Sequence, residues 1–174
     1  MRAHCQHWWS ILQLAGASAL LLLNGLADQT RRWRYYWFFL AVVFIFLSLD
    51  EAAEIHETMF AETLAPYAVN QFLRFTWIIP YAFAALLVAA IYVPFLHALP
   101  AKTRWGMVVA GALYVAAAVG AEALGAYCSA GGSSLCLKFS VIFEESGEII
   151  AIALFLLVLL KLLQLRCPMI AARL

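Results

Sequence analysis

Most of the ten acidic residues of this chain gather in stretches that are otherwise apolar. The first stretch is Leu-Ser-Leu-Asp-Glu-Ala-Ala-Glu-Ile-His-Glu at residues 47–57, and the second is Glu-Glu-Ser-Gly-Glu at residues 144–148. Glu122 lies alone in a third apolar run. A carboxylate in a bilayer-length apolar segment costs roughly 2.5 to 3.5 kcal/mol and by default marks a functional site. The spacing therefore predicts such a site.

A mixture of carboxylates and imidazole suits iron, zinc or manganese better than calcium or magnesium, whose sites are normally all oxygen. The candidate metal ligands are Asp50, Glu51, Glu54, His56, Glu57, Glu122, Glu144, Glu145 and Glu148. Four-helix di-iron sites combine two Glu with two Glu-x-x-His pairs. This chain departs from that pattern, because Ala53 stands three residues before His56 and no His accompanies Glu148. A di-metal site stays open as a hypothesis.

The depth of the acids along their helices suggests one common site. At 1.5 Å per residue, Glu122 and Glu144 lie about 7 Å inside the outer helix ends, and Asp50 and Glu148 lie about 13 Å inside. Carboxylates so placed need a divalent cation, protonation or a water-filled cleft.

These requirements favour a metal-dependent membrane enzyme, in which a spare carboxylate acts as general base toward metal-bound water or a lipid-like substrate. Two alternatives remain: a proton- or cation-coupled transporter element, and an accessory subunit whose acids pair with basic residues of a larger membrane complex.

Each acidic stretch also has a simpler interpretation. The second helix could leave the membrane near Leu49 and continue as a solvated acidic stalk. Residues 144–148 could lie at a wet helix N-terminus, where the helix dipole favours anions. Glu122 could make only a structural hydrogen bond, and His56 could be a surface residue.

Composition indicates an integral membrane protein. The 174 residues are 66% hydrophobic and 12% charged, and their mean hydropathy is +0.90, whereas about a quarter of the residues of a soluble protein are charged. The formal net charge of +1 excludes the basic footprint of a nucleic-acid-binding protein.

Hydrophobic stretches predict about five membrane-spanning helices, each of about 20 residues, with short loops between them. The stretches are residues 8–27, 35–59, 75–98, 105–127 and 139–163. We therefore predict one all-α domain over residues 1–174, a polytopic helix bundle in the lipid bilayer. The first stretch also resembles a signal peptide, with Gly25-Leu26-Ala27 as a small-residue cleavage site; we interpret it as a helix.

Lysine and arginine predict the orientation, because they favour cytoplasmic loops. One side holds Arg31, Arg32, Arg34, Lys102, Arg104, Lys161, Arg166 and Arg173, and the other holds Arg2, Arg74 and Lys138. The N-terminus is thus expected outside and the C-terminus inside. Cys128 and Cys136 bracket a flexible outer loop, where we expect a disulfide.

Several motifs resemble a family of small bacterial multi-pass membrane proteins. They are Leu-Ser-Leu-Asp-Glu-x4-His-Glu at residues 47–57, Trp77-Ile-Ile-Pro80, Gly111-Ala-Leu-Tyr with Glu122 downstream, and Glu144-Glu145-x-x-Glu148. The resemblance covers residues 35–163 and supplies no activity. It implies a bacterial inner-membrane location and marks as the pattern's own residues Asp50, Glu51, His56, Glu57, Glu122, Glu144, Glu145 and Glu148.

Overall fold

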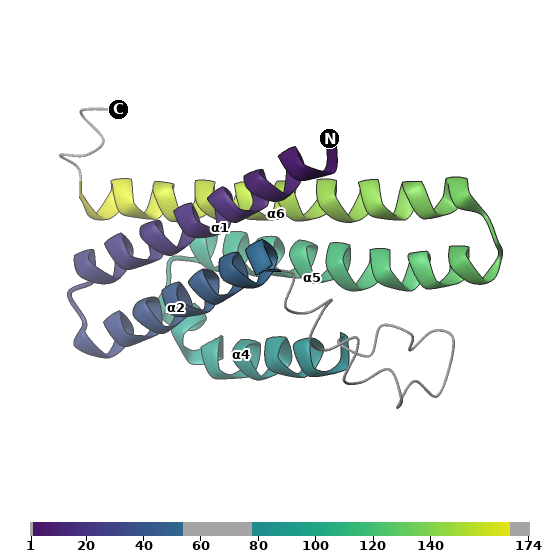
Figure 1. The fold of residues 1–174 in the computed structure, drawn as a ribbon. Coiled ribbons are helices and arrows are strands. Elements are labelled where there is room, and N and C mark those ends of the chain that lie inside the picture. Colours follow the sequence, from purple (N-terminus) through teal and green to yellow (C-terminus); the bar gives the residue numbers. More distant parts are fainter. Residues whose placement is uncertain (1, 54–77, 168–174) are drawn as a thin grey trace.

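Every element is a helix in the part of the chain that the structure describes. This computed structural model describes residues 2–53 and 78–167, with the side chains of all but residues 2–7, 78–80, 122, 126, 129 and 130. The helices are α1 (Arg2–Ala27), α2 (Arg31–Ala53), α4 (Ile78–Ala98), α5 (Ala101–Ala130) and α6 (Ser134–Arg166) (Figure 1).

Five helices within the described ranges are long and apolar enough to cross a membrane. This agrees with the predicted all-α, multi-pass architecture. α5 has 30 residues and α6 has 33, so at 1.5 Å per residue they are about 45 and 50 Å long. The hydrocarbon core of a bilayer is about 30 Å thick, so both helices are longer than a perpendicular crossing requires.

The helix boundaries differ from the predicted apolar stretches where capping overrides hydrophobicity. α5 and α6 extend past the predicted 105–127 and 139–163 and are joined by residues 131–133. Gly132 has a φ of +67° in this turn, which suits glycine. The Ser133 side chain then caps α6 by accepting a bond from the Cys136 N–H. The predicted continuation of α2 to residue 59 lies outside the described residues.

The helices pack side by side, with α1 against both α2 and α6, and α5 along the length of α6 (Figure 1). α4 contacts α2 and α5 over a smaller area. Leu14, Ala17 and Leu21 of α1 are buried in this packing. The first helix is therefore an integral part of the bundle in this structure.

The apolar core occupies one half of the bundle, the half in which α2 and α5 begin. Its buried members from the five helices are Ala17, Leu21, Trp37, Leu40, Ala41, Tyr92, Phe95, Leu99, Met107, Ala110, Phe155, Leu159 and Leu162. At its centre Phe95 is fully buried and lies edge-on to Trp37, with ring centroids 4.8 Å apart. The described residues of the acidic stretches, Asp50, Glu51 and residues 144–148, lie beyond this core, in the other half.

Polar side chains link the helices through backbone carbonyls. Ser18 of α1 donates to the Ala41 carbonyl of α2 at 2.9 Å, and Ser48 of α2 donates to Ile11 of α1 at 3.1 Å. Asn24 reaches the Leu159 carbonyl of α6 at 3.1 Å. Such bonds help to hold helices together where apolar packing has no water to exclude.

Candidate functional site

Asp50 lies near the described end of α2, and its side chain is only 5% exposed. The Tyr81 hydroxyl, in the first turn of α4, donates a 2.9 Å hydrogen bond to its Oδ1 atom. A buried carboxylate requires such partners, since burial without them costs several kcal/mol. This bond is also a direct polar connection between α2 and α4.

Close packing of α5 against α6 positions the second acidic stretch. Glu144 and Glu148 are four residues apart and share a face of α6, and both are partly buried. Gly147 lies so close to α5 that an added Cβ would be 2.6 Å from the Cβ of Ala117. Glu148 therefore directly follows a residue in close contact with α5.

Tyr114 lies on α5 one turn before Ala117, on the same side of the helix. The carboxylates of Glu148, Glu51, Asp50 and Glu144 are all close enough for their charges to act on its hydroxyl. Two of these residues come from α2 and two from α6. Tyr114 is therefore the residue around which acids from two helices are brought together.

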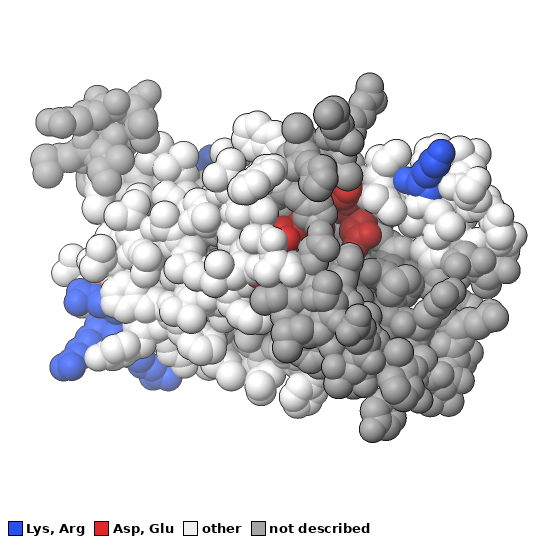
Figure 2. All heavy atoms as spheres, in the orientation of Figure 1, with Lys and Arg blue, Asp and Glu red and all other residues white. Residues whose placement is uncertain are grey.

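These residues define the carboxylate–tyrosine group, which consists of Asp50, Glu51, Tyr81, Tyr114, Glu144 and Glu148. Glu145 adjoins it, since its charge acts on Glu148. Figure 2 shows most of the visible acidic side chains near the middle of this face and most of the visible Lys and Arg side chains at one end of it.

Depth along the helices places this group within the apolar spans. The opposite end of the bundle, here called the basic end, is marked by Arg31, Arg32, Arg34, Lys102, Arg104, Lys161 and Arg166. At 1.5 Å per residue, Tyr114 lies about 15 Å from Arg104, Glu148 about 20 Å from Lys161, and Asp50 about 24 Å from Arg34. All three distances are shorter than the 30 Å or so of a hydrocarbon core.

The described side chains do not by themselves fit a metal ion. Within residues 2–53 and 78–167, no group of three or more His, Cys, Asp and Glu side chains could hold one. The predicted ligands Glu54, His56 and Glu57 lie outside the described residues, as does the side chain of Glu122 on α5. Metal binding by the predicted set stays a prediction.

Comparison with known families shows where the chain belongs. Residues 2–162 match a family model described as a domain of unknown function, DUF8692. The chain belongs to this family. No curated protein and no solved structure matches it. The family has no described function, which agrees with the resemblance found in the sequence.

The structure describes only part of the predicted set of site residues. Asp50 and Glu51 from the first acidic stretch, and Glu144 and Glu148 from the second, lie close enough to Tyr114 in the DUF8692 chain for their charges to act on its hydroxyl. The sequence analysis did not single out Tyr81 or Tyr114 as site residues. Tyr114 ends the Gly111-Ala-Leu-Tyr motif at a depth close to that of the acids, and this was the available signal.

A separate polar network lies at the basic end, around Asp28. Arg166 pairs with its Oδ2 atom at 2.8 Å, Trp37 donates to the same atom at 2.9 Å, and the Thr30 N–H donates to Oδ1 at 3.0 Å. Burial alone would raise the pKa of the Asp28 carboxyl, but these donors and the Arg166 charge outweigh burial. The pKa of Asp28 therefore lies below its ordinary value of 3.8.

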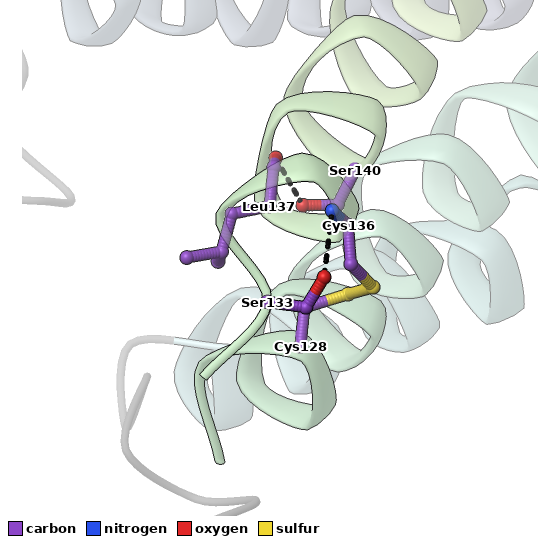
Figure 3. The surroundings of a disulfide bond; sticks show 5 residues. All are labelled: Cys128, Ser133, Cys136, Leu137 and Ser140. Carbon is purple, nitrogen blue, oxygen red and sulfur yellow. Dashed lines mark hydrogen bonds between the residues drawn. A yellow bond between two sulfur atoms is a disulfide. The ribbon is translucent and has the colours of Figure 1, made fainter. Parts of the chain in front are cut away.

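The predicted disulfide joins Cys128 and Cys136 at the far end of α5 and α6 (Figure 3). Their Cα atoms are 5.5 Å apart. Ser133 caps α6 beside the bond, and Ser140 donates to the Leu137 carbonyl at 2.9 Å. The turn that precedes the second acidic stretch is therefore fixed both covalently and by hydrogen bonds.

Proposed function

We propose that this DUF8692 chain is a multi-pass membrane protein that binds cations, protons in the first place, at the carboxylate–tyrosine group. The observation that supports this most is the action of four carboxylate charges from α2 and α6 on the Tyr114 hydroxyl. Like charges held together in a low dielectric disfavour one another, so the group lowers its free energy by taking up positive charge.

The residue types suit proton exchange. A carboxylate accepts a proton and a carboxylic acid donates one, and a phenol can do either. Tyr81 already donates a hydrogen bond to Asp50. A proton that binds to a neighbouring carboxylate is therefore next to a hydrogen-bonded phenol–carboxylate pair.

The group is open to one side of the membrane rather than part of a continuous path across it. Between the levels of Tyr114 and Asp28, no described residue facing the core is an Asp or a Glu. We infer that protons enter from the side of the α5–α6 turn. A binding site with one-sided access suits a sensor or a coupling element of a transporter better than a simple channel.

Orientation and location follow from the basic end and the disulfide. Positive charge favours the cytoplasmic side, and disulfides persist in oxidising compartments. The two features lie at opposite ends of the bundle, so they support the same orientation, with the N-terminus outside and the C-terminus inside. The resemblance to bacterial proteins supports the inner membrane as its location.

A divalent metal, iron, zinc or manganese, is the second candidate occupant. It would need ligands from Glu122 or from residues 54–57 in addition to the described acids. Glu122 lies on α5, two turns beyond Tyr114 and toward the same half of the bundle. The predicted enzyme activity and lipid-like substrate depend on that metal, whereas the predicted partner subunits would pair their basic residues with the acids.

A difference titration tests the proposal. Purified protein in mild detergent is titrated with acid beside Glu148→Gln, and proton uptake is counted per chain. We expect Glu148→Gln to take up about one proton fewer near neutral pH. Asp28→Asn is the matched control, because Asp28 is ionised in this range and its removal changes no uptake there.

The same samples are analysed for bound metal, with Glu122→Gln and Glu144→Gln added. If the wild type contains a stoichiometric metal that both variants lose, the cation bound at the group is the metal and not the proton. Equal proton uptake by the wild type and Glu148→Gln, without bound metal, would contradict the proposal.

A further inference from the structure

The basic end gathers cations from three places in the chain. Arg31, Arg32 and Arg34 begin α2, Lys102 and Arg104 begin α5, and Lys161 and Arg166 belong to the last turns of α6. Figure 2 shows the Lys and Arg side chains projecting at this end of the visible face. Among the residues whose side chains are described, Asp28 is the one carboxylate at this level and Lys138 the one cation near the opposite end.

Only some of these cations make polar contacts within the bundle. Arg166 pairs with Asp28, Arg34 donates to the Asp28 carbonyl at 3.0 Å, and Arg104 lies 3.4 Å from His97 Nδ1.

The other cations face outward. Arg31, Arg32, Lys102 and Lys161 are exposed, and the ion pair recorded between described residues joins Arg166 and Asp28 instead. Asp28 is already bound to Arg166, so these four charges have no described carboxylate to neutralise them.

Aromatic side chains place these cations at a membrane interface. Tyr35 is 59% exposed and Trp105 is 62% exposed, and each lies within four residues of exposed cations. Exposed Tyr and Trp concentrate at the headgroup level of a bilayer. The Arg32 guanidinium stacks over the Trp33 ring at 4.8 Å, which holds a cation beside the ring at this level. Both Arg and Lys bind phosphate groups.

We propose that the basic end binds the headgroups of anionic phospholipids in the adjoining leaflet through Arg31, Arg32, Lys102 and Lys161. The cations and the headgroups carry opposite charges and lie at the same depth. The exposed cations are at the level of the interfacial aromatic residues, where the phosphates carry net negative charge. This inference goes beyond the proposed proton site and depends only on the helices crossing a bilayer.

The test measures lipid selectivity directly. Purified protein is equilibrated with equimolar phosphatidylglycerol and phosphatidylcholine in mixed micelles, and bound lipids are counted by native mass spectrometry. We expect phosphatidylglycerol to be enriched. The combined change Arg31→Gln, Arg32→Gln, Lys102→Gln and Lys161→Gln should lower that enrichment roughly fivefold or more, given the contribution of each cation near an anionic surface.

Matched controls separate this surface from charge in general. Lys138→Gln removes a cation from the opposite end and should leave the enrichment unchanged, and Arg31→Lys with Arg32→Lys should retain most of it. Should the fourfold variant not fold, the wild type gives a second readout. Its enrichment should fall as salt rises from about 0.05 M to about 0.5 M, because exposed charges are screened.

Three results would overturn the proposal: no preference in the wild type, an unchanged preference in the fourfold variant, or an equal loss in Lys138→Gln. Displacement of the lipid by inorganic phosphate at matched concentration would also overturn it, since the surface would then bind a free anion.

Discussion

At the scale of single residues, hydroxyl groups decide how the buried acids can be accommodated. Asp50 is 5% exposed, yet it accepts a bond from Tyr81 and lies near Tyr114 together with three other acids. At the basic end, Asp28 is buried with Arg166 as its ionic partner. The chain thus stabilises a buried carboxylate in two ways, by an ion pair at the basic end and by a hydrogen bond from a phenol in the other half.

Replacing Tyr81 by Phe removes the hydroxyl that donates to Asp50 and leaves the rest of the ring in place. We expect the variant to lose about 1 kcal/mol of stability, because a buried acceptor loses a partner. Unfolding in mixed micelles by a denaturing detergent measures the change. Tyr127→Phe, at a side chain that is 66% exposed, should change stability little, and an equal loss in both would contradict the role of the bond.

Asp28 predicts a pH dependence whose sign follows from its lowered pKa. A carboxyl whose pKa is lower in the folded state stabilises above its unfolded value of 3.8, and this stability is lost as the pH falls through the folded value. At neutral pH, Asp28→Asn should cost on the order of 2 kcal/mol, because Arg166 loses a charged partner. The difference between wild type and variant should shrink from about pH 7 to about pH 2.

Measuring that difference by thermal unfolding at several pH values isolates Asp28 from the other titrating groups. A difference that is constant over the whole range, or one that grows in acid, would contradict the ion pair.

At the scale of elements, the contact between α5 and α6 sets the distance between Tyr114 and the second acidic stretch. Gly147 and Ala117 meet at a close contact between the two helices, where an added Cβ on Gly147 would be 2.6 Å from the Cβ of Ala117. The long α6 also reaches from the disulfide at one end to Arg166 at the other. One helix therefore links the fixed outer turn, the acids and the network around Asp28.

Gly147→Ala should destabilise the protein by about 1 to 3 kcal/mol, because the new methyl group would overlap the Cβ of Ala117 and force the helices apart. Gly111→Ala on α5 is the matched control, since no atom lies within 4 Å of an added Cβ there. Thermal unfolding of both variants measures the contrast. Similar stability in the two would show that the helices are not in close contact at Gly147.

Sequence patterns predicted the elements better than the contacts between them. Apolar run lengths were enough to predict five spanning helices, and the loop between Cys128 and Cys136 was enough to predict their disulfide. The sequence could not predict which helix faces contact each other, because Tyr114 lies among small apolar residues that could face lipid or protein equally well. Asp28 and Arg166 are separated by 138 residues, so their pairing depends on how α1, α2 and α6 pack. The extent of α5 and α6 depended on a cap at Ser133.

At the scale of the whole molecule, the bundle is polarised along its helix axes. Most of the described cations and the apolar core occupy one half, and the carboxylate–tyrosine group and the disulfide occupy the other. This polarity is consistent with a fixed orientation in a membrane and with proton access from one side.

Thiol labelling tests the orientation. In cells carrying Cys5→Ser, a membrane-impermeant maleimide should label Cys128 and Cys136 only after an impermeant reductant has opened their disulfide. Cys167, a free cysteine at the other end, should react only after the membrane is permeabilised. Labelling of Cys167 in intact cells would reverse the proposed orientation.

The central claim is that the acids around Tyr114 hold positive charge inside the membrane. Infrared spectroscopy of the protein in lipid bilayers at neutral pH detects protonated carboxyl groups directly through their C=O stretching band. We predict such a band in the wild type, its retention in Asp28→Asn and its reduction in Glu148→Gln. A wild-type spectrum without that band, from protein that also contains no bound metal, would contradict the claim.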